Sequence, residues 1–350
     1  MNNEIKQTVL VDKIVVAFTK LKIDITPEQI TQELAQAKKL GVTNTFFSVK
    51  TKEKDYLVRV NGTLWAPYKR EDEAHVLNIL KEHGIETNVL FHGEEFQISL
   101  KPNQNMRLDQ LLQFQTPELV DKALYLTAQQ IKKYQRLDGI KTKYPLEQML
   151  ADAESALFKK MANISEEKTI LLKSFAEACH KILKVLEHAN PVFTYSHTDL
   201  LPTSIYVDIE QAKVSIVDWE YSALSYWSND IAMVSRSLTH RQKEIWLNHY
   251  HSIQCENNTL MPEEQKLQIQ LNQHIQDFLN IAWKMTANNW SEFQLELDTM
   301  KENLSLFTKR LDIRHKKLTQ GVTDSFFSFY QENPYNKDTI SPSFNAILQG

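Results

Sequence analysis

The stretch of this chain that decides its fold is Ser196-His197-Thr198-Asp199-Leu200-Leu201-Pro202-Thr203-Ser204, soon followed by Val217-Asp218-Trp219-Glu220-Tyr221. Apolar runs at residues 192–195 and 214–217 lead into Asp199 and Asp218. Between them, residues 205–208 are typical of a strand and residues 210–213 of a turn, which predicts a short hairpin with an aspartate at each mouth. Phosphoryl transfer needs two such carboxylates, one to accept a hydroxyl proton and one to hold magnesium.

Length and composition narrow the class of protein. With 350 residues and 42% hydrophobic content, the chain can form one large domain or two lobes that share a cleft. Its net charge of −4, from 40 basic and 44 acidic residues, lacks the basic excess of a nucleic-acid-binding surface. Cys179 and Cys255 are too few and too far apart for a disulfide framework or a zinc site, which favours a reducing compartment.

The N-terminus begins with polar residues and lacks the basic and apolar regions of a signal peptide. No stretch approaches the roughly 20 apolar residues of a membrane-spanning helix. We therefore expect a soluble cytoplasmic protein, acting in its own cell or in a cell into which it is delivered.

The first part of the chain predicts a small α+β lobe preceded by helices. Residues 4–20 have amphipathic helical spacing, and a second helix begins at Pro27 after a Thr26 cap and ends at Leu40-Gly41. The period then changes to two at residues 45–49 and 56–60, which predicts two strands. A helix over residues 70–83 and strands at 89–92 and 96–100 complete the lobe, with residues 101–105 as a connector.

The rest of the chain is predicted to be mostly helical. Helical spacing occurs around Leu124, Ala128 and Ile131, and again at residues 170–186, 267–285 and 297–311. Only the hairpin region at residues 192–218 is expected to interrupt these helices. We divide the chain into an N-terminal helical segment (1–37), an N-lobe (38–102), a helical C-lobe (103–332) and a poorly packed tail (333–350).

The order of the acidic residues resembles that of the choline kinase and aminoglycoside phosphotransferase superfamily. That superfamily has a His-x-Asp loop, then a metal-binding aspartate, then an aspartate before an apolar pair at the start of a helix. Here Asp218 follows Asp199 by 19 residues, and Asp230 follows Asp218 by 12. The resemblance covers roughly residues 38–310 and is strongest at 192–232. It implies an α+β, bilobal, protein-kinase-like fold with a small antiparallel-sheet N-lobe and a large, mainly helical C-lobe.

The resemblance also implies a role for each of these residues. Asp199 would accept the proton of the substrate hydroxyl, and Asp218 would bind the Mg²⁺ that bridges the nucleotide phosphates. His197 is expected to brace the catalytic loop, and Asp230 to fix that loop by hydrogen bonds. ATP is the implied co-substrate and Mg²⁺ the implied cofactor.

Ser204 is the main departure from the family pattern, which usually has asparagine five residues after the catalytic aspartate as a second metal ligand. A serine hydroxyl is able to bind Mg²⁺ directly or through water. The same residue also fits weakened metal binding or a lost activity. A second departure is Tyr226-Trp227, where relatives often carry Asp-Pro.

In the N-lobe, Leu40-Gly41-Val42-Thr43-Asn44-Thr45-Phe46 resembles the family's glycine-threonine-asparagine loop over the phosphates. Gly41, Thr43 and Asn44 would bind the nucleotide through backbone and side-chain groups, although a helix stop explains Gly41 equally well. Arg59 lies where kinase-like folds place a cation over the phosphates. Glu73 is its expected partner, with Glu71 as the alternative one turn away.

The acceptor is suggested by Trp219-Glu220-Tyr221, because choline, ethanolamine and some thiamine kinases often carry an aromatic residue, Glu and Tyr after the metal aspartate. A quaternary ammonium cannot donate hydrogen bonds, so it needs a carboxylate and aromatic faces. Glu220 would supply the charge, and Trp219, Tyr221 and Trp283 the aromatic faces. Further candidates are Trp290, Tyr226 and Trp227, and for any one aromatic residue a place in the core is an equal expectation.

Three hypotheses follow from these patterns. The first is a kinase for choline or a similar cationic amino alcohol, with no nucleic-acid partner. The second is the same fold acting on an aminoglycoside or on thiamine. The third is a pseudokinase of the same fold, which Ser204 and the single glycine of the phosphate loop keep open.

Overall fold

The computed structural model describes residues 3–37, 44–62, 68–101, 106–160, 166–189, 193–254 and 260–286. Gly41, Thr43 and Trp290 lie outside these ranges. So do the helix expected at residues 297–311, the expected tail and most of the expected connector. No helix in the described part of the chain is both long enough and apolar enough to cross a membrane.

Two helices precede the N-lobe sheet, α1 (Asn3–Lys20) and α2 (Pro27–Ala35). Thr26 caps α2 through a reciprocal capping box with Gln29, and Pro27 occupies the first turn as expected. The helix ends at Ala35, earlier than the end predicted at Leu40-Gly41. The N–H of Gln36 bonds to the carbonyls of Glu33 and Leu34, which tightens the last turn and closes the helix there.

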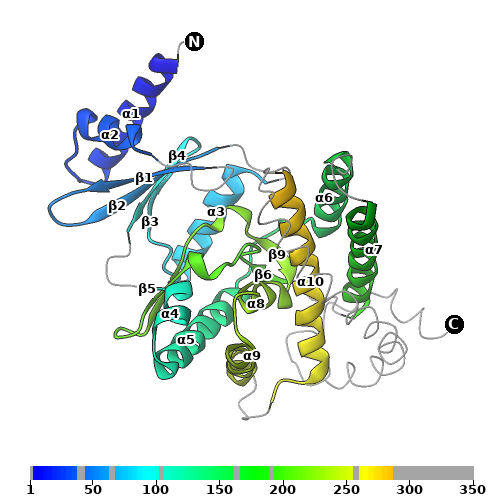
Figure 1. Ribbon diagram of the computed structural model, residues 1–350. Coiled ribbons are helices and arrows are strands. Elements are labelled where there is room, and N and C mark those ends of the chain that lie inside the picture. The colour runs from blue at the N-terminus through cyan, green and yellow to red at the C-terminus, as the bar shows by residue number, and fades with distance from the viewer. Residues whose placement is uncertain are drawn as a thin grey trace.

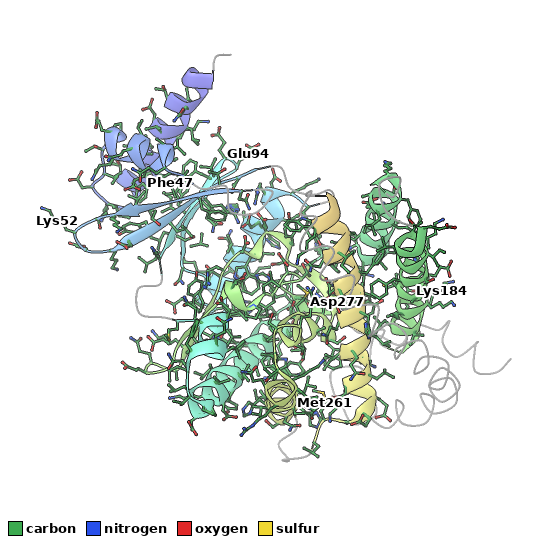
Figure 2. All side chains as sticks on the ribbon, in the orientation of Figure 1. Phe47, Lys52, Glu94, Lys184, Met261 and Asp277 are labelled. Carbon is green, nitrogen blue, oxygen red and sulfur yellow. The ribbon has the colours of Figure 1, made fainter. Side chains whose placement is uncertain are left out.

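The N-lobe is an antiparallel sheet of β1 (Thr45–Lys50), β2 (Asp55–Val60), β3 (Val89–His92) and β4 (Phe96–Leu100), in the order β1-β2-β4-β3. Helices α1 and α2 cover one face (Figure 1). Phe47 and Val58 are buried on that face against Ile14 and Phe18 of α1 (Figure 2). Because successive strand residues point to opposite faces, Arg59 points away from α1, toward α3 (Arg70–Glu82).

The C-lobe is mainly helical. Its described helices are α4 (Leu108–Phe114), α5 (Pro117–Gln135), α6 (Leu146–Lys160), α7 (Glu166–Ala189), α8 (Ser228–Ser235), α9 (His240–Gln254) and α10 (Glu263–Thr286). Helix α10 runs beside α6, α7 and α8 (Figure 1). The sequence did not predict α4, α6 or α9 as separate helices.

The C-lobe also contains more strands than expected. The predicted hairpin is β7 (Ile205–Asp208) and β8 (Lys213–Ile216), and β5 (Met106–Arg107) adds a third strand beside β7. The strand before the loop that carries Asp199 is β6 (Phe193–Ser196), and it does not join this hairpin. It pairs instead with β9 (Ala223–Tyr226), which follows the loop that carries Asp218. The prediction of one hairpin as the sole interruption was therefore wrong.

Candidate active site

The loop that carries Asp199 is fixed by Asp230, which lies in the first turn of α8 and is fully buried. Its carboxylate accepts hydrogen bonds from the backbone N–H groups of His197 (2.8 Å) and Thr198 (2.9 Å), and from the hydroxyl of Tyr134 (2.7 Å). Burial raises the pKa of Asp230 to about 6, while these hydrogen bonds favour its ionised form. These contacts hold the backbone of His197 and Thr198 against the start of α8.

His197 links the loop that carries Asp199 to the loop that carries Asp218. Its Nε2 donates to the carbonyl of Val217 at 2.9 Å, and its ring lies 4.7 Å from that of Trp219. Burial lowers the pKa of His197 to about 4, so the imidazole is neutral at physiological pH. This neutral, buried ring therefore contacts the residue just before Asp218.

Both loops contain a residue in the left-handed backbone region. Thr198 has φ 67° and Asp218 has φ 70°, conformations that are rare for residues other than glycine, above all for a β-branched threonine. The Thr198 hydroxyl donates to the carbonyl of Tyr221 at 2.5 Å and so ties the loops together. Such strain persists only where the surrounding structure enforces it, and it clusters at functional sites.

The two aspartates are brought together across the base of the hairpin. The carbonyl of Ser204 accepts the N–H of Val217 at 3.0 Å, which places Ser204 opposite the residue just before Asp218. Burial raises the pKa of Asp199 to about 7, and the charge of Asp218 adds to this effect. The Asp218 side chain remains 41% exposed, so it is accessible to a ligand.

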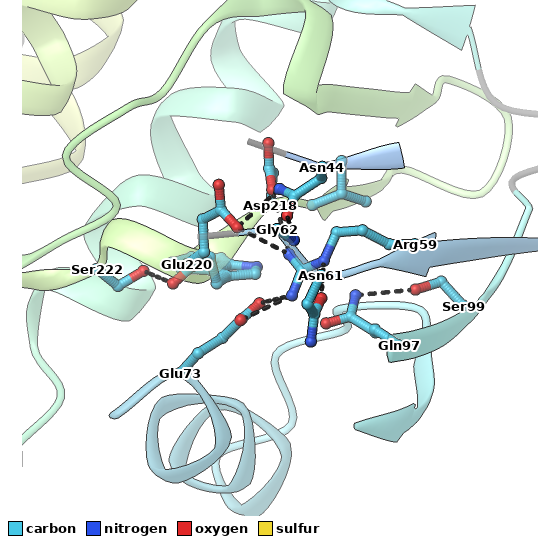
Figure 3. A network of polar contacts seen from close by, with 12 residues as sticks. Asn44, Arg59, Asn61, Gly62, Glu73, Gln97, Ser99, Asp218, Glu220 and Ser222 are labelled. Carbon is cyan, nitrogen blue, oxygen red and sulfur yellow. Dashed lines mark hydrogen bonds and ion pairs between the residues drawn. The ribbon is translucent and has the colours of Figure 1, made fainter. Parts of the chain in front are cut away.

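The expected ion pair of the N-lobe forms with Glu73 rather than with Glu71. Arg59 Nη2 lies 2.7 Å from both carboxylate oxygens of Glu73, and Nη1 lies 3.4 Å from Asp218 Oδ1 (Figure 3). Burial alone would raise the pKa of Glu73, but the charge and hydrogen bonds of Arg59, together with His92 and Arg70, outweigh it and hold that pKa below its usual value. Glu73 therefore holds the Arg59 guanidinium in place beside Asp218.

Glu220 is where the structure departs most from the sequence-based expectation. Its carboxylate is buried and accepts hydrogen bonds from Arg70 Nη1 (2.8 Å) and Asn44 Nδ2 (2.9 Å), both from the N-lobe. Arg59 Nη1 lies 3.5 Å away. A buried carboxylate needs such partners. In this structure Glu220 therefore joins the lobes, and its charge is neutralised by arginines instead of facing an acceptor.

Trp219 also differs from expectation, because it is a core residue. Its ring is 1% exposed, stacks on Tyr195 and meets Tyr134 edge-on, and its Nε1 donates to the carbonyl of Ile216. The assignment of Trp219 to the acceptor site is therefore corrected, since neither face of the ring is available to a ligand. Trp283 lies near the end of α10 with 48% of its surface exposed.

Two further aromatic residues considered for the acceptor site, Tyr226 and Trp227, also pack within the protein. Tyr226 is buried in β9, and Trp227 stacks on Tyr250 while its Nε1 donates to Gln268. Tyr226 therefore belongs to the buried cluster formed with α6, α7 and α10, and Trp227 packs against α9 and α10.

Two tyrosines that the sequence did not single out lie near Asp199. Tyr68, just before α3, meets Tyr221 edge-on with ring centroids 5.0 Å apart. Tyr144, just before α6, belongs to the same buried cluster. Burial raises the pKa of both phenols, and the Asp199 carboxylate adds to each shift. No motif surrounds either residue, so only the tertiary fold reveals that they lie near Asp199.

The charges of the site fit a divalent cation. Glu73, Glu220 and Asp218 share two basic partners, Arg59 and Arg70, so these three carboxylates and Asp199 face two arginines in the described part of the site. Carboxylate oxygens are preferred ligands of Mg²⁺. Within the described residues, no cluster of three or more His, Cys, Asp or Glu side chains could hold a metal alone. Phosphate and water oxygens would therefore complete the metal shell.

The fold is similar to those of several solved kinases. It resembles choline kinase LicA from Streptococcus pneumoniae (17% identity, TM-score 0.60, covering 84% of this chain and 99% of that chain). It also resembles an ethanolamine kinase from Plasmodium vivax (16% identity, TM-score 0.58, 85% and 88%). A third similar structure is the aminoglycoside phosphotransferase APH(2″)-IIIa with GDP and kanamycin (10% identity, TM-score 0.58, 79% and 97%). At these identities the likeness shows the protein-kinase-like fold.

The sequence itself carries the family assignment. No curated protein matches the chain. A sequence model of the choline/ethanolamine kinase family matches residues 36–275, which leaves α1 and α2 outside the match. This match spans well over half of the 350 residues and includes the loops of Asp199, Asp218 and Asp230. The chain therefore belongs to the choline/ethanolamine kinase family and is an ATP-dependent small-molecule phosphotransferase.

Proposed function

We propose that this protein transfers the γ-phosphate of ATP to the hydroxyl of choline or a similar cationic amino alcohol. The observation that carries the proposal is the pair Asp199 and Asp218, held on two interlocked loops beside the Arg59–Glu73 ion pair. Asp199 is the general base, because its pKa of about 7 lets it both lose and accept a proton near neutrality.

In the proposed reaction, the oxygen of the acceptor hydroxyl forms a bond to the γ-phosphorus, and Asp199 accepts the proton of that hydroxyl. The bond between that phosphorus and the β,γ-bridging oxygen breaks, and ADP leaves. Bound Mg²⁺ would neutralise the phosphate oxygens, with Asp218 as its ligand and Ser204 as a candidate second ligand. Arg59, oriented by Glu73, adds positive charge beside Asp218, and Asn44, which belongs to the expected phosphate loop, directly precedes β1.

Recognition of the acceptor rests on the tyrosines beside Asp199. Tyr221 is half-buried, and Tyr68 and Tyr144, which are buried in this structure, belong to the same cluster and come from two other segments near Asp199. Aromatic faces attract a quaternary ammonium, and the unbalanced carboxylates of the site favour a cation. These tyrosines replace Trp219 and Glu220 as the proposed acceptor-binding residues. Trp283, on the exposed side of α10, remains a candidate contact.

An acceptor screen tests the proposal. ADP release from Mg²⁺-ATP is measured with choline, ethanolamine, thiamine and kanamycin, each with the wild type and with Asp199→Asn. We expect the highest kcat/KM for choline or ethanolamine, and a loss of about 10²-fold or more in the variant. A preference for kanamycin or thiamine would favour the second hypothesis. Tight nucleotide binding without turnover of any acceptor would favour a pseudokinase.

A further inference from the structure

Arg70 is held by four partners that come from both lobes. It is the first residue of α3 and is 10% exposed. Its Nη1 donates to Glu73 (2.9 Å) and to Glu220 (2.8 Å), and its Nη2 donates to Asn44 Oδ1 (3.0 Å) and to the carbonyl of Gly62 (3.2 Å). Glu220 belongs to the C-lobe and the other three to the N-lobe. The guanidinium therefore spans the junction between the lobes.

Asn44 closes this arrangement into a ring of contacts. Its Nδ2 donates to Glu220 at 2.9 Å, and its Oδ1 accepts the N–H of Gly62 at 3.1 Å as well as the bond from Arg70 (Figure 3). Asn44 precedes β1 and Gly62 follows β2. The ring thus fixes the ends of two neighbouring strands relative to a single carboxylate of the C-lobe.

The position of Glu220 couples this ring to the chemistry. Glu220 lies two residues after Asp218, within the short helical turn η3 (Trp219–Tyr221) that contacts α3. Asp218 holds a left-handed backbone conformation, which needs support from its surroundings. Anchoring Glu220 to Arg70 and Asn44 supplies that support from the N-lobe.

We propose that Arg70 is a positioning residue that joins Glu220 to Asn44 and Gly62, and thereby sets the distance between the nucleotide-binding strands and Asp218. The proposal rests on the proposed function, because the ligand so positioned is the magnesium-bound triphosphate. Arg70 acts through Glu220 and Asn44 and does not itself react. Its planar fork is required, since one ammonium group cannot bond to Glu220, Asn44 and Gly62 in these directions at once.

The test uses the full chain and the probe Mg²⁺-AMPPNP, whose binding is measured by calorimetry. The variants are Arg70→Met, Arg70→Lys, Glu220→Gln and the double variant Arg70→Met/Glu220→Gln. The double variant leaves no unpaired carboxylate at position 220, which protects against failure to fold. The matched control is Arg107→Met, which breaks an ion pair with Asp109 and leaves the contacts of Arg70, Glu220, Asn44 and Gly62 in place.

We expect Arg70→Met to weaken Mg²⁺-AMPPNP binding by about tenfold or more, with the acceptor KM changed by less than about twofold. Arg70→Lys should recover only part of the affinity. The double variant should bind no more weakly than Arg70→Met alone, because both changes break one contact. Unchanged nucleotide affinity in Arg70→Met, with a lower Tm as the only effect, would overturn the proposal. Losses of Mg²⁺-AMPPNP affinity that are strictly additive in the double variant would also overturn the proposal.

A second measurement separates this proposal from the proposed function. Hydrogen exchange of residues 217–222 in the protein without nucleotide should be faster in Arg70→Met than in the wild type and in Arg107→Met. If the wild type fails to bind Mg²⁺-AMPPNP but exchange still accelerates, the proposed function is wrong and the inter-lobe role of Arg70 stands. Unchanged exchange in this segment would refute the role of Arg70.

Discussion

Replacing Asp199 by asparagine is expected to stabilise the protein at pH 8 while removing most of its activity. The folded state raises the pKa of Asp199 from 3.8 to about 7, through burial and the nearby charge of Asp218. Between these values the folded state binds more protons than the unfolded state, so the free energy of unfolding falls as the pH rises from about 4 to about 7. Asparagine has nearly the same shape and lacks this repulsion.

The size of the effect follows from the shift. A change of about three pKa units corresponds to about 4 kcal/mol. Asp199 is partly open to solvent, which screens the repulsion, so we expect a gain of about 1–2 kcal/mol at pH 8. In a chain of this size that raises Tm by about 1–3 °C. At pH 5, where Asp199 is already protonated in the folded state, the wild type and the variant should unfold at nearly the same temperature.

The assay is thermal unfolding by circular dichroism at pH 5 and pH 8, without nucleotide or metal. Asp24→Asn, an exposed residue in the turn between α1 and α2, is the control and should show no pH-dependent difference from the wild type. An Asp199→Asn variant that is equally stable or less stable than the wild type at pH 8 would refute the electrostatic account of the site.

Three further outcomes follow from the same contacts. Asp230→Asn should lower the free energy of unfolding in urea by about 2–4 kcal/mol, because a buried amide cannot accept all three hydrogen bonds of the carboxylate; a wild-type urea midpoint would contradict this. Trp219→Phe should destabilise the protein by about 1–3 kcal/mol and leave the choline KM within about twofold; a large rise in KM at unchanged stability would return Trp219 to the acceptor site. Ser204→Asn should lower the free Mg²⁺ concentration for half-maximal rate, since an amide oxygen reaches further than a hydroxyl; identical curves would show that serine already suffices or that no ligand is needed there.

The sequence predicted the N-lobe well because local patterns determine it. The period-two runs and turn residues place β1, β2, β3 and β4 within about one residue of their observed bounds. The Arg59–Glu73 pair was expected from the resemblance of the flanking segments to the family pattern, and Asp230 was singled out by the order and spacing of the acidic residues.

The errors arose where a side chain's direction depends on long-range packing. Trp219 and Glu220 are adjacent to a site residue, but the turn η3 directs one into the C-lobe core and the other toward Arg70. The pairing of β6 with β9 links residues on either side of the hairpin, which no local period encodes. Tyr68 and Tyr144 reach Asp199 from separate segments, so their proximity depends on tertiary contacts alone.

The most direct test of the proposed reaction follows the phosphate itself. Purified protein is incubated with Mg²⁺, choline and ATP labelled in the γ-phosphate, and the label in phosphocholine is quantified for the wild type, Asp199→Asn, Asp218→Asn and Asp24→Asn. We predict transfer by the wild type and Asp24→Asn, a loss of about 10²-fold or more in Asp199→Asn with nucleotide affinity retained, and weakened Mg²⁺-nucleotide binding in Asp218→Asn. Full transfer by both site variants, or none by the wild type, would contradict the account.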